Sequence, residues 1–67
     1  MNNIILIEQY KITLLDSKTN GIKWEIDESK YISGTYRLDK YIFLYTYDWT
    51  GTVFTSLINL KDGSFYW

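Results

Sequence analysis

Hydrophobic and polar residues alternate with a period of two along most of the chain, and no segment keeps a helical period for three turns. In the clearest case, Ile22–Asp27, the residues Ile22, Trp24 and Ile26 share one face and polar residues occupy the other. Such a pattern predicts an antiparallel strand with one buried and one solvated side. The same criterion predicts further strands at Ile4–Ile7, Tyr10–Leu15, Lys30–Leu38, Tyr41–Tyr47, Thr52–Leu60 and Ser64–Trp67.

The count is six strands if Ile4–Ile7 continues into the following strand, and seven if it does not. We therefore expect one all-β domain over residues 1–67: a small antiparallel meander sheet or partly open barrel of six to seven strands, with tight hairpins and little or no helix. Asn20-Gly21 favours a type I′ hairpin turn. Gly34, inside a predicted strand, indicates a bulge or a close approach of another backbone.

Tyr41–Tyr47 is apolar on both faces, because aromatic residues alternate there with Ile42 and Leu44. A strand covered on both sides is central in its sheet. In so short a chain, we expect a second copy or a foreign protein to cover one of these faces.

Aromatic residues are the most informative feature of the composition, with seven Tyr, three Trp and three Phe in 67 residues. This number exceeds what one thin core can enclose, and Tyr and Trp are enriched in the contact centres of protein interfaces. We predict Trp24, Phe43 and Trp67 in the core. The predicted partner-binding residues are the run Tyr45, Tyr47, Asp48 and Trp49, with a weaker second patch at Tyr31, Tyr36 and Arg37.

The length and the missing residue types favour oligomerisation. A core in a chain below roughly 70–80 residues rarely supplies more than ~3–5 kcal/mol, and small proteins add disulfides, metals or partner subunits. The sequence has no Cys and no His. We therefore expect a homodimer or a higher homo-oligomer, with no metal and no cofactor.

The charge distribution argues against nucleic acid as a partner, because seven basic residues are scattered among eight acids and the net charge is −1. No apolar run approaches the ~18–20 residues of a membrane span. The N-terminal segment lacks the features of a signal peptide, so we expect a cytoplasmic protein without a membrane partner. The residue usage (many Ile, Lys, Asn and Tyr) fits AT-rich codons and a low-GC bacterium or its phage.

Catalysis is not expected. Without Cys or His there is no cysteine nucleophile, Ser-His-Asp triad or histidine base, and the four glycines form no phosphate-binding loop. Asp27 and Glu28 are adjacent, and neighbouring strand residues point to opposite faces, so we predict no metal site there. The carboxyl groups of Asp39 and Asp48 are expected to be solvated turn residues.

Two segments, 12–24 and 55–67, form a weak internal repeat with an offset of 67 − 24 = 43 residues. Leu, Lys and Trp coincide at positions 14/57, 18/61 and 24/67. The pattern Leu-Asp-x-Lys-Thr-Asn-x-x-x-Trp from Leu15 to Trp24 resembles the outer hairpin of quinoprotein-like (PQQ-type) β-propeller blades. In that family, Leu-Asp-x-x-Thr-Gly-x-x-x-Trp turns the chain between the last two strands of a blade. Here Asn20 replaces the turn glycine, and the second copy lacks the Asp and the Thr. The resemblance implies an antiparallel meander with aromatic-anchored hairpins; it does not indicate a quinone cofactor.

Three functional hypotheses follow. The first is a small intracellular interaction protein that binds and inhibits or neutralises another protein, of the type found among phage anti-defence (anti-CRISPR-like) and bacterial immunity proteins. The second is an oligomer that sequesters a nucleotide or sugar between subunits. The third is a blade-like structural module that assembles with itself. The first is our leading expectation.

Overall fold

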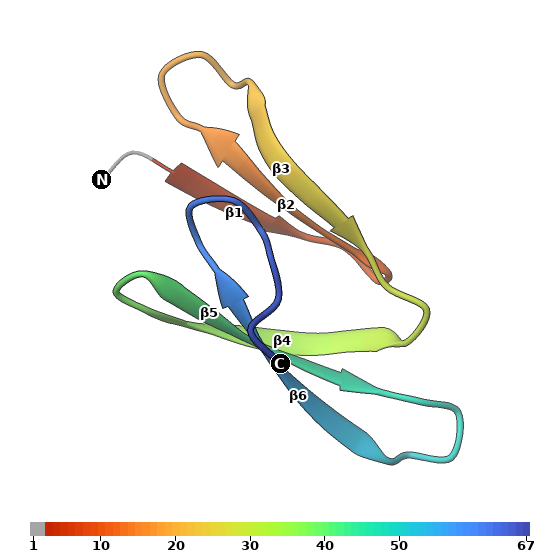
Figure 1. Ribbon diagram of the computed structural model, residues 1–67. Helices are drawn as coiled ribbons and strands as arrows, with labels where there is room; N and C mark the ends of the chain where they lie inside the picture. Colours follow the sequence, from red (N-terminus) through yellow and green to blue (C-terminus); the bar gives the residue numbers. More distant parts are fainter. Residues whose placement is uncertain (1–2) are drawn as a thin grey trace.

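The computed structural model describes residues 3–67 as six strands in two antiparallel sheets (Figure 1). The first sheet contains β1 (Asn3–Ile7), β2 (Lys11–Asp16) and β3 (Ile22–Asp27) in that order. The second contains β4 (Tyr31–Leu38), β5 (Tyr41–Tyr47) and β6 (Val53–Asn59) in that order. The predicted all-β antiparallel fold is confirmed with six strands, which form two open sheets instead of a barrel.

Met1 and Asn2, the first residues of the N-terminal segment considered above, lie outside the described range. Among the described residues, no helix is long and apolar enough to cross a bilayer.

One face of each sheet contributes to a shared hydrophobic core. Its buried side chains are mostly aliphatic, and they are Ile12, Leu14, Trp24, Ile42, Leu44, Ile58 and Leu60. Three half-buried residues, Ile5, Ile26 and Ile32, pack against this cluster. Branched side chains on a pleated surface fill the space between two sheets well. This explains why the side of β5 that contains Ile42 and Leu44 is the one turned inward.

Trp24 joins the first sheet to the turn that follows β6. Its indole Nε1–H donates a hydrogen bond of 2.8 Å to the carbonyl oxygen of Leu60 in the protein interior. Its ring also lies against Gly63, where an added Cβ would come within 2.8 Å of the ring atoms. Gly63 has a φ of 77°, a value that favours glycine. The turn therefore closes on Trp24 because Gly63 has no side chain.

The chain after β6 turns back and runs along the edge of that strand. The backbone N–H of Leu57 donates to the Trp67 carbonyl at 2.7 Å, and the N–H of Tyr66 donates to the Leu57 carbonyl at 2.7 Å. Phe65 forms an antiparallel bridge with Ile58. The predicted last strand is thus present only as a short paired segment, and we call it the C-terminal segment.

The hairpin loop after β2 and the loop after β6 have the same geometry, although the first was predicted to be a type I′ turn. That turn needs a positive φ at two consecutive residues. Asn20 has a φ of 60°, but the φ of Gly21 is not positive. Instead, the N–H of Asn20 donates to the Asp16 carbonyl at 2.7 Å across a wider loop. In the second loop the N–H of Gly63 donates in the same way to the Asn59 carbonyl, at 2.8 Å.

Two β-bulges change which side chains are buried. One lies between Ile32 and Gly34, where the sequence predicts an irregularity. The other lies in the β2–β3 pairing, between Leu14 and Leu15, and the sequence analysis did not predict it. Because of this second bulge, Ile22 leaves the face that Trp24 occupies, and its side chain is exposed. The prediction that Ile22 shares a buried face with Trp24 is therefore wrong.

The three predicted core aromatics have different outcomes. Trp24 is buried, as predicted. Phe43 is only half-buried, and Trp67 is 61% exposed. Both predictions of core positions were wrong for the same reason, since these two rings lie on the side of the second sheet that faces away from the first.

Candidate binding surfaces

The outward side of the second sheet is built mainly from aromatic residues, and we call it the aromatic face. In β5 the buried residues Ile42, Leu44 and Thr46 alternate with aromatic residues, which must therefore point away from the core. Cross-strand neighbours and the C-terminal segment extend this surface, which comprises Tyr31, Tyr36, Tyr41, Phe43, Tyr45, Tyr47, Leu57, Tyr66 and Trp67. A contiguous group of partly exposed aromatic side chains is a candidate interaction site.

The rings of the aromatic face support one another. Phe43 lies between Tyr36 and Trp67, with ring centroids 6.4 and 6.2 Å away. Tyr47 stacks on Tyr31 with centroids 5.3 Å apart and planes inclined by only 6°. Such neighbours restrict side-chain rotation, so a partner that binds here would immobilise few additional rotamers.

The structure brings together four of the predicted partner-binding residues, and one of them, Tyr31, stacks on Tyr47. Tyr45 and Tyr47 lie on the aromatic face, and Tyr36 joins them because it is opposite Phe43 in the β4–β5 register. Arg37, which follows Tyr36 in β4, points to the other side of the sheet and is opposite buried Ile42. The predicted patch of Tyr36 with Arg37 is therefore divided between two surfaces. A binding role for these residues stays a prediction.

Asp48 shapes the turn between β5 and β6. Its Oδ1 accepts hydrogen bonds from the backbone N–H groups of Thr50 at 2.9 Å and Thr52 at 3.1 Å, and from the Thr50 hydroxyl. The hydroxyl hydrogen bond is the main cause that lowers the pKa of Asp48 below its usual value, and desolvation opposes it. The carboxylate is thus occupied in holding the turn.

Trp49, the next residue, is 94% exposed and extends from this turn into solvent. Beside it lies a smaller cleft of about 390 Å³, whose lining includes Tyr10, Lys30 and Tyr31 together with Tyr47. The predicted run from Tyr45 to Trp49 therefore occupies one end of the aromatic face and the adjoining turn.

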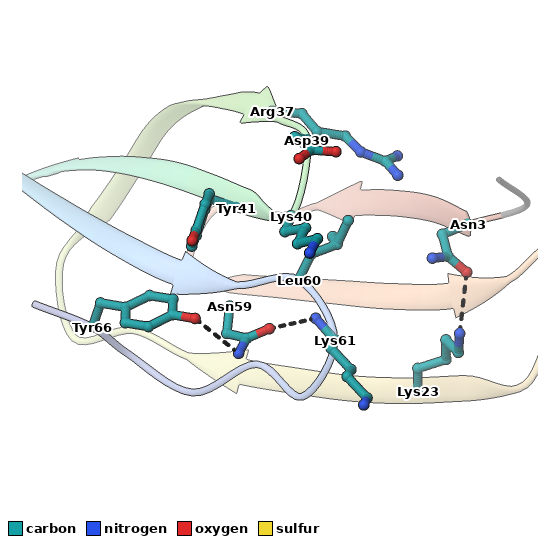
Figure 2. A pocket seen from close by; sticks show the side chains of 10 residues that line it. All are labelled: Asn3, Lys23, Arg37, Asp39, Lys40, Tyr41, Asn59, Leu60, Lys61 and Tyr66. Atoms are coloured by element: carbon teal, nitrogen blue, oxygen red, sulfur yellow. Dashed lines mark hydrogen bonds between the residues drawn. The ribbon is translucent and has the colours of Figure 1, made fainter.

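A larger, open cleft of about 850 Å³ lies at the opposite end of the second sheet. We call it the basic cleft, because four of its lining side chains are basic and one is acidic: Lys23, Arg37, Lys40 and Lys61 against Asp39. Figure 2 shows Lys23 and Asn3 on one side of this cleft and Tyr66 on the other. More than half of the seven basic residues in the chain meet here.

Asn59 organises the aromatic end of the basic cleft (Figure 2). Its Oδ1 accepts the backbone N–H of Lys61 at 2.8 Å, and its Nδ2 donates to the Tyr66 hydroxyl at 3.1 Å. Tyr66 in turn packs edge-on against Tyr41, with centroids 5.3 Å apart. The cleft thus combines two oriented rings with several cationic groups. This is a combination that suits a planar ligand carrying negative charge.

Sequence reasoning missed this convergence, because Lys23 and Lys61 are far apart in the chain. Of the basic residues in the cleft, only Arg37 was singled out from the sequence. The available signal was their position: Lys23 lies near the start of β3, and Lys61 follows β6. The two lysines come together only because the two hairpins pack against each other, which the sequence did not show.

The described residues contain no group of three or more carboxylates that could hold a metal ion. The chain matches no protein-family model, no curated protein and no solved structure. The surfaces described above are therefore the features of the molecule that bear on its function.

Proposed function

We propose that the chain is a protein-binding module whose working surface is the aromatic face. The observation that carries this proposal is the exposure of Tyr36, Tyr41, Tyr47, Tyr66 and Trp67, each between 36% and 61%, on one side of one sheet. Partly exposed Tyr and Trp side chains offer large apolar contact area at a low cost in side-chain entropy. Where the partner is a foreign protein, covering part of its surface would inhibit it, which is the role that the sequence analysis expects.

The test compares binding by the wild type with binding by Tyr36→Ala. Tyr36 is 57% exposed, so its truncation should leave the fold intact. Tagged protein is incubated with a low-GC bacterial lysate and, separately, with untagged copies of itself, and native mass spectrometry identifies what is retained. We expect a stoichiometric protein partner, with affinity reduced about 30-fold in the variant, since a central aromatic contributes about 2 kcal/mol.

Phe65→Ala is the matched control. Phe65 is also a partly exposed aromatic of the C-terminal segment, but it is opposite Ile58 and so lies on the inward side of the sheet. Its truncation should leave partner binding unchanged. If no protein is retained, or if Tyr36→Ala binds as tightly as the wild type, the aromatic face is not the working surface.

The basic cleft supports a second candidate function, the binding of a phosphorylated small molecule such as a nucleotide. Arg37 can form two parallel hydrogen bonds to a phosphate, and the lysines add positive charge. Tyr41 and Tyr66 also line the cleft, although they lie on the side of the sheet opposite to Arg37, and they offer ring surfaces for a base.

Thermal unfolding with ADP or inorganic pyrophosphate tests this second function. At saturating ligand we expect the Tm to rise by about 5 °C or more. Arg37→Gln and Lys61→Gln should each reduce the rise, while Lys18→Gln, in the β2–β3 loop outside the cleft, should preserve it. No shift at millimolar ligand, or an equal shift in all variants, would remove the candidate.

A further inference from the structure

The two hairpins with matching loops also pair in the same register. Leu15 is opposite Ile22 in the first hairpin, and Ile58 is opposite Phe65 in the second, which is the same arrangement 43 residues later. Trp24 and Trp67 then occupy equivalent places, two residues beyond Ile22 and Phe65. The internal repeat seen in the sequence is therefore a repeat of local structure.

The equivalent faces of the two hairpins have different surroundings: one is buried in the core, and the other faces away from it. The face of the first sheet that contains Leu14 and Trp24 is buried in the core. The corresponding face of the second sheet contains Leu57 and Trp67, and it is the aromatic face. The neighbouring strands agree, because Ile5 is opposite Leu14 and Phe43 is opposite Leu57. The aromatic face thus repeats a surface that, in the first sheet, is covered by another sheet.

The converse holds for the outward side of the first sheet, which we call the aliphatic face. Three of its apolar residues correspond in register to core residues of the second sheet: Ile4 to Ile42, Leu6 to Leu44 and Leu15 to Ile58. The ion pair between Lys11 and Glu25 lies at the other end of this face. Yet Ile4 is 44% and Leu6 47% exposed. The aliphatic face is therefore built like a surface that, in the second sheet, packs against a sheet.

We propose that copies of this chain stack head to tail, with the aromatic face of one copy on the aliphatic face of the next. This inference rests on the proposed function, since it names the protein that occupies the aromatic face. The contact between copies would repeat the packing between the two sheets inside each copy. Each copy carries both complementary surfaces, and neither one requires a foreign partner.

The intramolecular contact shows what anchors such a stack. Trp24 donates to the Leu60 carbonyl and lies against Gly63. By the repeat, Trp67 would meet the loop after β2 of the next copy, with Ser17 in the place of Leu60 and Asn20 in the place of Gly63. Asn20 carries a side chain where Gly63 has none, so the contact between copies is looser than the internal one.

An interface between two different surfaces does not close on a pair of molecules. Repeating the same rotation gives a ring when it closes and a filament when it does not. The proposal therefore predicts assemblies of more than two copies. An interface between two aromatic faces would instead stop at a two-fold dimer.

Two variants, each with one defective face, test the proposal. Trp67→Ala removes the anchor of the aromatic face, and Leu6→Lys places a charge on the aliphatic face. We expect light scattering and native mass spectrometry to show assemblies larger than a dimer for the wild type and monomers for each variant. The variants should form a 1:1 heterodimer when mixed, because each retains one of the two complementary faces. Phe65→Ala should assemble as the wild type does.

Asn20→Gly is a variant that should strengthen the association between copies. Asn20 already has a positive φ that glycine adopts readily, and removal of its side chain lets Trp67 approach as Trp24 approaches Gly63. We expect at least tenfold tighter association. Unchanged or weaker association would contradict docking of Trp67 on this loop.

The remaining outcomes separate this inference from the proposed function. A dimer that persists in Leu6→Lys and is lost in Trp67→Ala overturns the head-to-tail stack but keeps the aromatic face as a protein-binding surface. The same holds for a monomeric wild type that retains a foreign protein through Tyr36. A monomer that binds no protein overturns both.

Discussion

Gly63→Ala is expected to remove most of the free energy of unfolding at 25 °C. Gly63 has a φ of 77°, which costs a residue with a side chain about 1–2 kcal/mol. The new Cβ would also lie 2.8 Å from Trp24 ring carbons, and forcing an extra methyl into a packed site costs about 1–3 kcal/mol. The sum approaches the ~3–5 kcal/mol that a core of this size supplies. Urea unfolding followed by tryptophan fluorescence measures the loss.

Two other glycines separate these causes. Gly51 has a φ of 86° but no atom within 4 Å of an added Cβ, so Gly51→Ala should show only the backbone cost. Gly34 has neither constraint, and Gly34→Ala should change the free energy of unfolding least. If Gly63→Ala and Gly51→Ala destabilise the protein equally, the contact of Gly63 with Trp24 does not limit the fold.

The strands were predictable because alternation is a local property. The two apolar faces of Tyr41–Tyr47 were visible in the sequence, and β5 is indeed central in its sheet. The sequence could not show which face meets the other sheet. The side of β5 that contains Ile42 and Leu44 is the buried one. Phe43 and Trp67 were therefore assigned to the core when they belong to the outer surface.

The candidate surfaces were predicted less completely, for a related reason. Tyr36 and Arg37 are neighbours in sequence, but alternation in β4 sends them to opposite sides of the sheet. Lys23 and Lys61 are distant in sequence and meet only because the hairpins pack together. The internal repeat was detectable, and the matching loops give it a structural counterpart. The resemblance to propeller blades stays a prediction.

Trp24→Phe is expected to lower the free energy of unfolding by about 1–3 kcal/mol. Phenylalanine preserves most of the apolar contact but has no donor for the Leu60 carbonyl, which Trp24 Nε1 reaches at 2.8 Å in the interior. An acceptor that loses its buried partner carries its desolvation cost into the folded state. The midpoint of urea unfolding, at an unchanged slope, measures the effect.

Trp49→Phe is the control, because the same chemical change at a side chain that is 94% exposed should alter stability by less than about 0.5 kcal/mol. Equal stabilities of Trp24→Phe and the wild type would mean that the indole hydrogen bond contributes nothing to joining the first sheet to the turn after β6. The anchor proposed for Trp67 copies that bond between molecules, so the same result would leave the stacked assembly with ring packing alone. A clear loss in Trp24→Phe would show that the repeated tryptophan contributes through its donor as well as its area.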